Sequence, residues 1–79
     1  MIKGVPLYHN RMLAYFSYDH LPEHLQEVSK PFHALATKIV RQVAAGKLDR
    51  DESLASLRKL LEAKDAAVRA ALPPVVDAS

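Results

Sequence analysis

The sequence predicts an all-α fold: a helical hairpin with a proline-bent first helix and a long second helix, which oligomerises through helix packing. Two long stretches carry apolar residues at steps of three and four, the spacing that lines one face of a helix. Gly46 separates these stretches, and Pro73 with Pro74 ends the second one. We therefore expect an extended or loosely ordered N-terminal lead at residues 1–14, a helical domain at 15–72 and a C-terminal tail at 73–79.

The first helix is predicted over residues 22–45. Pro22 suits the first helical position, where its missing N–H is not needed, and Glu23 complements the positive end of the helix dipole. Gly46 suits the C-terminus because glycine adopts positive φ without strain. The apolar face of this helix is expected to consist of Leu25, Val28, Phe32, Leu35, Ile39 and Val43.

A proline interrupts the pattern of this first helix. Pro31 cannot donate a hydrogen bond to the carbonyl of Glu27, and its ring crowds that carbonyl. The helix should therefore bend or restart at this point, with Ser29 as a local cap for its second half. We expect a short segment over residues 22–29 and a longer one over 31–45.

The second helix is predicted to begin at Asp49, because Glu52 follows three residues later at the spacing of a capping box. Alanines crowd residues 63–71, and such small side chains let another helix approach closely. The apolar face is expected to consist of Leu54, Leu57, Leu60, Leu61, Val68 and Leu72. The charged residues interpreted as ordinary surface pairs are Arg58, Lys59, Glu62, Lys64 and Asp65.

The predicted hairpin is too small to cover all of its own leucines. A chain of this size buries only about 60% of the surface that its unfolded form exposes. The chain contains no cysteine, so neither disulfides nor thiolate metal sites add stability. Self-association is the remaining common source of stability, and the alternating steps between Leu25 and Ile39 favour helix packing of the coiled-coil type.

The composition argues against several functional classes. Lys and Arg number 11 against 9 Asp and Glu, a net charge of +2 without a basic block, which argues against binding a nucleic-acid polymer. No stretch approaches the roughly 18 apolar residues that span a bilayer, and no secretion signal is evident, so we expect a cytosolic protein without a membrane partner. Because the chain lacks cysteine, a Gly-x-Ser-x-Gly elbow and a glycine-rich phosphate loop, we expect no enzyme activity and no cofactor.

Ring-bearing side chains are confined to one part of the chain, since every aromatic residue and every histidine lies within the first 33 positions. Tyr15, Phe16 and Tyr18 directly precede a predicted helix start, where free N–H groups favour anions such as phosphate. Aromatic faces nearby would hold nucleobases. The alternative is that Tyr15 and Phe16 pack onto the hairpin as a hydrophobic lid, an interpretation that suits Phe16 better than Tyr18.

Two other sets of side chains have the chemistry of ligands. His20 and His24 have the spacing of a zinc site, to which a neighbouring glutamate would add a carboxylate. Pro22 places His20 before the helix, so we interpret both histidines as exposed rather than metal-binding. The second set consists of cations. If the aromatic segment binds a nucleotide, the side chains that could reach its phosphate are Lys30, beside the proline bend, with Lys38, Arg41 and Arg50.

Two segments carry a pattern of aromatic, acidic and small residues. Residues 15–36 read YFSYDHLPEHLQEVSKPFHALA, and residues 51–72, preceded by Arg50, read DESLASLRKLLEAKDAAVRAAL. The aromatic-x-Tyr lead, the Leu-Ala pair in the first helix, the Arg-acidic-x-Ser-Leu-Ala start and the alanine-rich end resemble small phage-encoded helical proteins, the anti-CBASS sponges. These sequester the cyclic-oligonucleotide messengers of bacterial antiviral signalling. The chain departs from the pattern in a shorter stretch after Tyr18 and in Ser29, where a basic residue is expected.

The resemblance implies a compact hexamer that holds cyclic dinucleotides at its subunit interfaces and cyclic trinucleotides in a second type of pocket. It implies that Tyr18 stacks on a base, that Lys30 meets a phosphate, and that Arg50 contacts the trinucleotide. His20 and His33 complete the predicted ligand-binding set, and no metal ligand is assigned. The alternative function is a small helical interaction or regulatory module of phage origin, whose Tyr/Phe cluster docks another protein.

Overall fold

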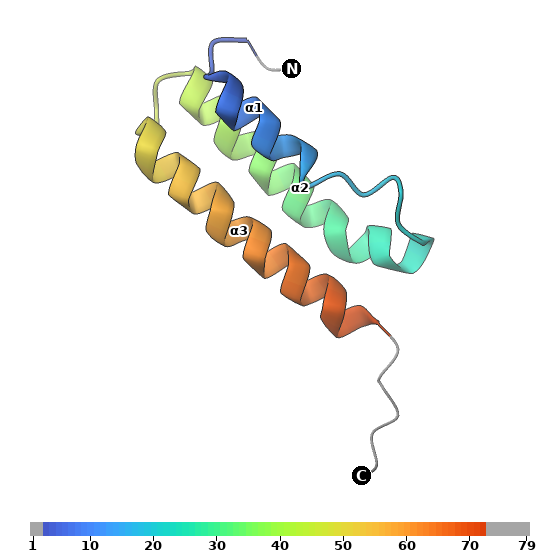
Figure 1. The fold of residues 1–79 in the computed structure, drawn as a ribbon. Helices are drawn as coiled ribbons and strands as arrows, with labels where there is room; N and C mark the ends of the chain where they lie inside the picture. Colours follow the sequence, from blue (N-terminus) through green and yellow to red (C-terminus); the bar gives the residue numbers. More distant parts are fainter. Residues whose placement is uncertain (1–2, 73–79) are drawn as a thin grey trace.

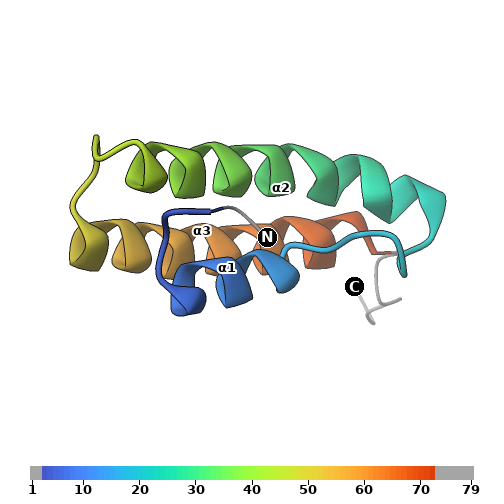
Figure 2. The ribbon, with the colours of Figure 1, turned by 90° about the horizontal axis from the view of Figure 1, so that it is seen from above.

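The computed structural model describes residues 3–72, which form three helices (Figure 1). These are α1, Leu7–Ala14, α2, Glu23–Ala44, and α3, Arg50–Ala71. α2 and α3 make an antiparallel hairpin, and α1 packs against both on one side of it (Figure 2). The all-α prediction is confirmed for the described residues, and the predicted tail at 73–79 lies outside them. None of the three helices combines the length and the apolar composition that crossing a bilayer requires.

Local hydrogen bonds set the ends of the two long helices where they meet. Asp49 Oδ2 accepts a hydrogen bond from the backbone N–H of Glu52 at 2.8 Å, which confirms the predicted cap of α3. Gly46 has a φ of +73°, as predicted for the end of α2. The backbone N–H of Lys47 then donates to the carbonyl of Gln42 at 2.9 Å, the long bond of a Schellman motif. This motif turns the chain from α2 toward α3.

α2 runs without interruption through Pro31, so the prediction that the helix divides at residues 29–31 is wrong. Pro31 and Glu27 are both exposed, which places the carbonyl that lacks its donor on the solvent side, where water hydrates it. Ser29 is fully buried within the continuous helix instead of capping a second one. Packing against α3 holds the helix across the proline, and the bend itself stays a prediction. Pro22 is the N-cap of α2, so the helix begins at Glu23, one residue later than predicted.

The prediction that residues 1–14 form an extended or loosely ordered lead is wrong for α1. His9 and Met12 are buried against the hairpin. His9 Nε2 lies 3.0 Å from Ser53 Oγ and 3.1 Å from the carbonyl oxygen of Arg50. Because Ser53 Oγ itself donates to that carbonyl at 2.8 Å, we assign the proton to His9 Nε2, which donates to α3. A helix of eight residues is unstable alone in water, so these contacts are what hold α1 in place.

One core joins all three helices. Its buried members are Met12, Phe16, Ala36, Val40 and Leu57. Phe16 is completely buried, which confirms the lid interpretation for this residue, whereas Tyr15 is 62% exposed, so that interpretation is wrong for Tyr15. Leu35, predicted on the apolar face, is 47% exposed, while Leu25 and Val43 are buried as predicted. In the middle of α2, the buried residues are therefore Ala36 and Val40 instead of the predicted Leu35 and Ile39, a shift of one residue. The reason is that α1 covers the side of the helix that includes Ala36 and Val40.

Candidate functional site

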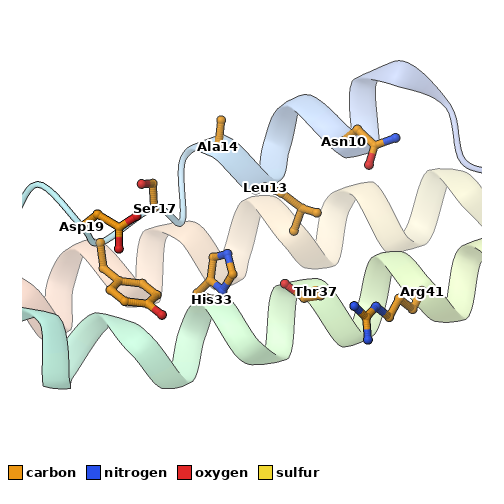
Figure 3. A pocket seen from close by; sticks show the side chains of 9 residues that line it. Asn10, Leu13, Ala14, Ser17, Asp19, His33, Thr37 and Arg41 are labelled. Carbon is orange, nitrogen blue, oxygen red and sulfur yellow. The ribbon is translucent and has the colours of Figure 1, made fainter. Parts of the chain in front are cut away.

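A groove of about 570 Å³ lies between α1, the α1–α2 connection and α2 (Figure 3). α1 contributes Asn10, Leu13 and Ala14, the connection contributes Ser17, Tyr18 and Asp19, and α2 contributes His33, Thr37 and Arg41. Two rings, three hydroxyls, an amide, a carboxylate and a guanidinium therefore meet in one solvent-open depression. This set fits a polar ligand that carries both a flat ring and a charged group.

The α2 wall of the groove follows from residue spacing. His33, Thr37 and Arg41 are separated by steps of four, so their side chains lie on one face of the helix. At a rise of about 1.5 Å per residue, this face spans roughly 12 Å from His33 to Arg41. The wall runs beside the buried stripe that contains Ala36 and Val40, so core packing fixes its orientation.

The opposite wall is fixed by a short turn. Phe16 is completely buried, and the backbone N–H of Leu21 donates to the carbonyl of Tyr18 at 3.0 Å, so the connection is held on both sides of Tyr18. The rings of Tyr18 and His33 meet edge to face, with centroids 5.4 Å apart and planes at 81°. Aromatic rings favour this T-shaped arrangement because a positive ring edge meets a negative ring face. Both rings stay partly exposed toward the groove.

The groove is charged oppositely at its two ends. Asp19 lies at one end and Arg41 at the other, with His33 and Thr37 between them (Figure 3). A carboxylate accepts hydrogen bonds from the N–H groups of a nucleobase, and a guanidinium binds phosphate oxygens in a bidentate manner. The polarity therefore matches a nucleotide that lies along α2 with its base toward Asp19 and its phosphate toward Arg41.

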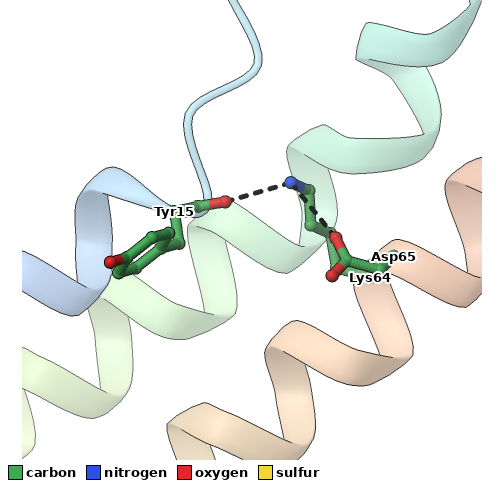
Figure 4. Close-up of polar contacts among 3 residues, drawn as sticks. All are labelled: Tyr15, Lys64 and Asp65. Carbon is green, nitrogen blue, oxygen red and sulfur yellow. Dashed lines mark hydrogen bonds and ion pairs between the residues drawn. The ribbon is translucent and has the colours of Figure 1, made fainter.

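A buried lysine holds the connection that carries Tyr18 (Figure 4). Lys64 is only 9% exposed, and its Nζ donates to the carbonyl oxygen of Tyr15 at 3.0 Å. Lys64 Nζ also lies 3.7 Å from Asp65 Oδ1, so the predicted pairing is present, but the prediction of a surface lysine is wrong. The reason is that Lys64 extends from α3 to the C-cap of α1, where its Nζ meets the Tyr15 carbonyl. Lys64 thus fixes the end of α1, next to Phe16 and the groove.

We expect Lys64→Ala to lower the free energy of unfolding by about 1–3 kcal/mol, because it leaves the Tyr15 carbonyl without its donor and removes a buried stem. Urea denaturation followed by circular dichroism measures this change. The matched control is Lys59→Ala, which removes an exposed lysine from the same helix and should shift stability by no more than about 0.5 kcal/mol. Equal midpoints for the two variants would contradict the anchoring role of Lys64.

The predicted ligand-binding residues separate into two groups within one protomer. Tyr18 and His33 lie together in the groove. His20 and Lys30 are exposed and do not line it. Arg50 is exposed at the start of α3. Its backbone carbonyl accepts hydrogen bonds from the His9 and Ser53 side chains.

Several groove residues were not predicted from the sequence. Asp19 and Thr37 were not singled out as ligand contacts, and Arg41 was named only as one of several cations. The four-residue steps from His33 to Arg41 are a signal that identifies this wall. The α1 wall was hidden because α1 was not predicted, although His9 and Phe16 have the spacing of one helical face.

No metal centre is evident in the described part of the chain. Within residues 3–72, no group of three or more His, Cys, Asp or Glu side chains gathers in a way that would hold a metal ion. His20 and His24, the pair considered for zinc, are both exposed. The chemistry of the groove is that of hydrogen bonding, ring contact and charge.

Comparison of the chain with protein-family models, with curated proteins and with solved structures found no match. The geometry of the groove therefore provides the main basis for a functional proposal. Its distinguishing feature is the ring pair of Tyr18 and His33 in one hollow with Arg41.

Proposed function

We propose that this protein binds cyclic oligonucleotides and withholds them, without transforming them, at interfaces between copies of itself. The observation that supports the proposal is the groove in which the Tyr18 and His33 rings share a hollow with Arg41. Aromatic rings stack on nucleobases regardless of sequence, and guanidinium groups pair with phosphate. The resemblance to phage anti-CBASS sponges agrees with this function, which would counter antiviral signalling in the cytosol of an infected bacterium.

The energetics favour a site shared between copies of the chain. A stacked base contributes about 1–3 kcal/mol and a charge-assisted hydrogen bond about 1.5–3 kcal/mol, so one ring and one cation supply roughly 2.5–6 kcal/mol. Association first costs at least about 4 kcal/mol, and nanomolar capture needs a net of about 12 kcal/mol. Two copies around one cyclic dinucleotide would double the contacts. We therefore propose a homo-oligomer, and the resemblance suggests a hexamer.

Exposed apolar side chains support self-association. The large apolar residues that remain exposed in the described chain are Leu7, Tyr8, Tyr15, Leu35, Leu48 and Leu72. Leu7 and Tyr8 lie on α1, Leu35 lies on α2, and the others lie next to helix ends, so apolar surface remains that a second copy of the chain could cover. Lys30 and Arg50, which are exposed and do not line the groove of their own chain, would be available to a ligand held by a neighbouring copy.

Titration with cyclic dinucleotides tests the proposal. We expect cyclic di-GMP or cyclic di-AMP to release or absorb heat with the parent protein in isothermal titration calorimetry. Tyr18→Ala should raise Kd by about 5- to 140-fold, the equivalent of the 1–3 kcal/mol that a stacked base contributes. The control is Tyr15→Ala, which removes an exposed tyrosine that does not line the groove and should leave Kd within about twofold.

Native mass spectrometry completes this test by reporting subunit number and ligand stoichiometry together. Absence of both heat and thermal stabilisation at high micromolar cyclic di- and trinucleotide would refute the proposal. If Tyr18→Ala instead dissociates or unfolds the assembly, Tyr18 is a packing residue and not a ligand contact.

A second candidate function is that of a helical module that docks another protein. Leu7 and Tyr8 on α1, with Tyr15 at its end, are each more than half exposed. The guanidinium carbon of Arg58 lies 5.9 Å from the centre of the Tyr8 ring, which orients that ring at the surface of α1 and α3. The Tyr8→Ala, Tyr15→Ala double variant separates the two functions, because it should abolish docking to a protein partner while leaving the nucleotide titration unchanged.

A further inference from the structure

A second hollow of about 340 Å³ continues the groove toward the end of α2. Its polar lining consists of Thr37, Lys38, Arg41, Gln42 and Lys47. Thr37 and Arg41 line both hollows, so the two form one continuous depression along α2. Arg41 stands at the junction between them.

The positive charge of this surface is concentrated in the second hollow. Lys38, Arg41 and Lys47 line it without any acidic residue, whereas the lining of the first hollow includes one carboxylate, Asp19, and one guanidinium, Arg41. Within residues 3–72, the ion pair with a nitrogen-to-oxygen distance below 4.0 Å is that of Lys64 with Asp65. No carboxylate of this part of the chain therefore lies within 4.0 Å of Lys38, Arg41 or Lys47. The three charges are therefore not neutralised by the described chain.

The C-terminus of α2 opposes an anion here, but weakly. A helix end carries about half a negative charge, which is small against three full positive charges. The last carbonyls are also occupied, because the N–H of Gly46 donates to Val43 and the N–H of Lys47 donates to Gln42. The positive φ of Gly46 turns the chain so that Lys47 follows α2 and lines the hollow.

We propose that the second hollow is a phosphate subsite, and that the ligand of this groove carries at least two phosphates. One phosphate lies at Arg41, on the junction, and the next lies between Lys38 and Lys47. Lys38 and Arg41 are three residues apart, which places their Cβ atoms about 5–6 Å from each other and lets them contact successive phosphates. This inference rests on the proposed function for the ring end of the ligand, and it adds which cations of the groove hold the successive phosphates of that ligand.

The test compares ligands with one and two phosphates. We expect the parent protein to bind cyclic di-GMP more tightly than cyclic GMP in calorimetry at low salt. The Lys38→Ala, Lys47→Ala double variant should raise Kd for cyclic di-GMP by about tenfold or more, and leave Kd for cyclic GMP within about twofold. The matched control is the Lys3→Ala, Lys59→Ala double variant, which removes two exposed lysines that line neither hollow.

The outcomes separate this inference from the proposed function. If the parent binds cyclic di-GMP and the Lys38→Ala, Lys47→Ala variant binds it equally well, the subsite is refuted and the function stands. If the parent binds no nucleotide, the function fails, and the subsite is then judged by inorganic tripolyphosphate in NMR titration. Shifts at the amides of residues 38–47 that disappear in the double variant support the subsite, and their absence refutes it.

Discussion

Replacing Phe16 by alanine is expected to lower the free energy of unfolding by about 3–5 kcal/mol, which is the usual effect of truncating a fully buried phenylalanine. The Phe16 side chain sits in the core with Met12 from α1 and Leu57 from α3, so its loss leaves a cavity at the junction of the helices. Native domains are stable by only about 5–15 kcal/mol, and a chain of this size belongs near the lower limit. Chemical denaturation at 25 °C measures the change.

Tyr15→Ala is the control for this variant. Tyr15 adjoins Phe16 in the chain but is 62% exposed, and its backbone carbonyl, which accepts from Lys64, survives the substitution. We expect Tyr15→Ala to change stability by no more than about 0.5 kcal/mol. Equal unfolding midpoints for the two variants would show that the core does not include the α1–α2 connection.

Arg41→Ala is expected to have the largest effect on ligand binding, because Arg41 lines both hollows. Loss of a charge-assisted contact of about 1.5–3 kcal/mol corresponds to a rise in Kd for cyclic di-GMP of about 10- to 140-fold. Arg41→Lys should recover only part of the affinity, because an ammonium group lacks the planar fork that holds a phosphate with two parallel bonds. Calorimetry with all three proteins measures the series.

Arg69→Ala serves as the control for charge. Arg69 is an exposed cation in the last turn of α3 and lines neither hollow. Both arginine-to-alanine variants should unfold at the same urea concentration as the parent, because Arg41 is exposed too. If Arg41→Ala binds cyclic di-GMP as the Arg69→Ala variant does, the groove is not the nucleotide site.

The long helices were predictable because their signals are local. The start of α3 depends on a side chain and an N–H three residues apart, Asp49 and Glu52, and the end of α2 depends on Gly46. The predicted division of the helix at Pro31 was wrong because a proline in the sequence indicates the loss of one backbone hydrogen bond, but not the tertiary packing that compensates for this loss. A helix that packs along its length against another tolerates that loss on its solvent side.

The candidate site was predictable only in part. Tyr18 and His33 were named from the sequence and lie together in the structure, because the α1–α2 connection places Tyr18 beside the middle of α2, where His33 lies. Lys30 was preferred among the cations for its position beside Pro31, yet Arg41, two turns beyond His33, is the one that lines the groove. The predicted bend and the resemblance favoured Lys30, whereas the four-residue spacing from His33 places Arg41 on the wall of the groove.

The sequence by itself determined the all-helical class, the limits of α2 and α3 and the turn between them, because each depends on contacts within a few residues. Only the tertiary structure decided that α1 is a helix, that Lys64 is buried and that a groove exists. Each of these requires residues far apart in the chain to meet, as His9 meets Ser53 and Tyr15 meets Lys64. A short helix has too few hydrogen bonds of its own to persist, so its conformation follows from the surface that it covers.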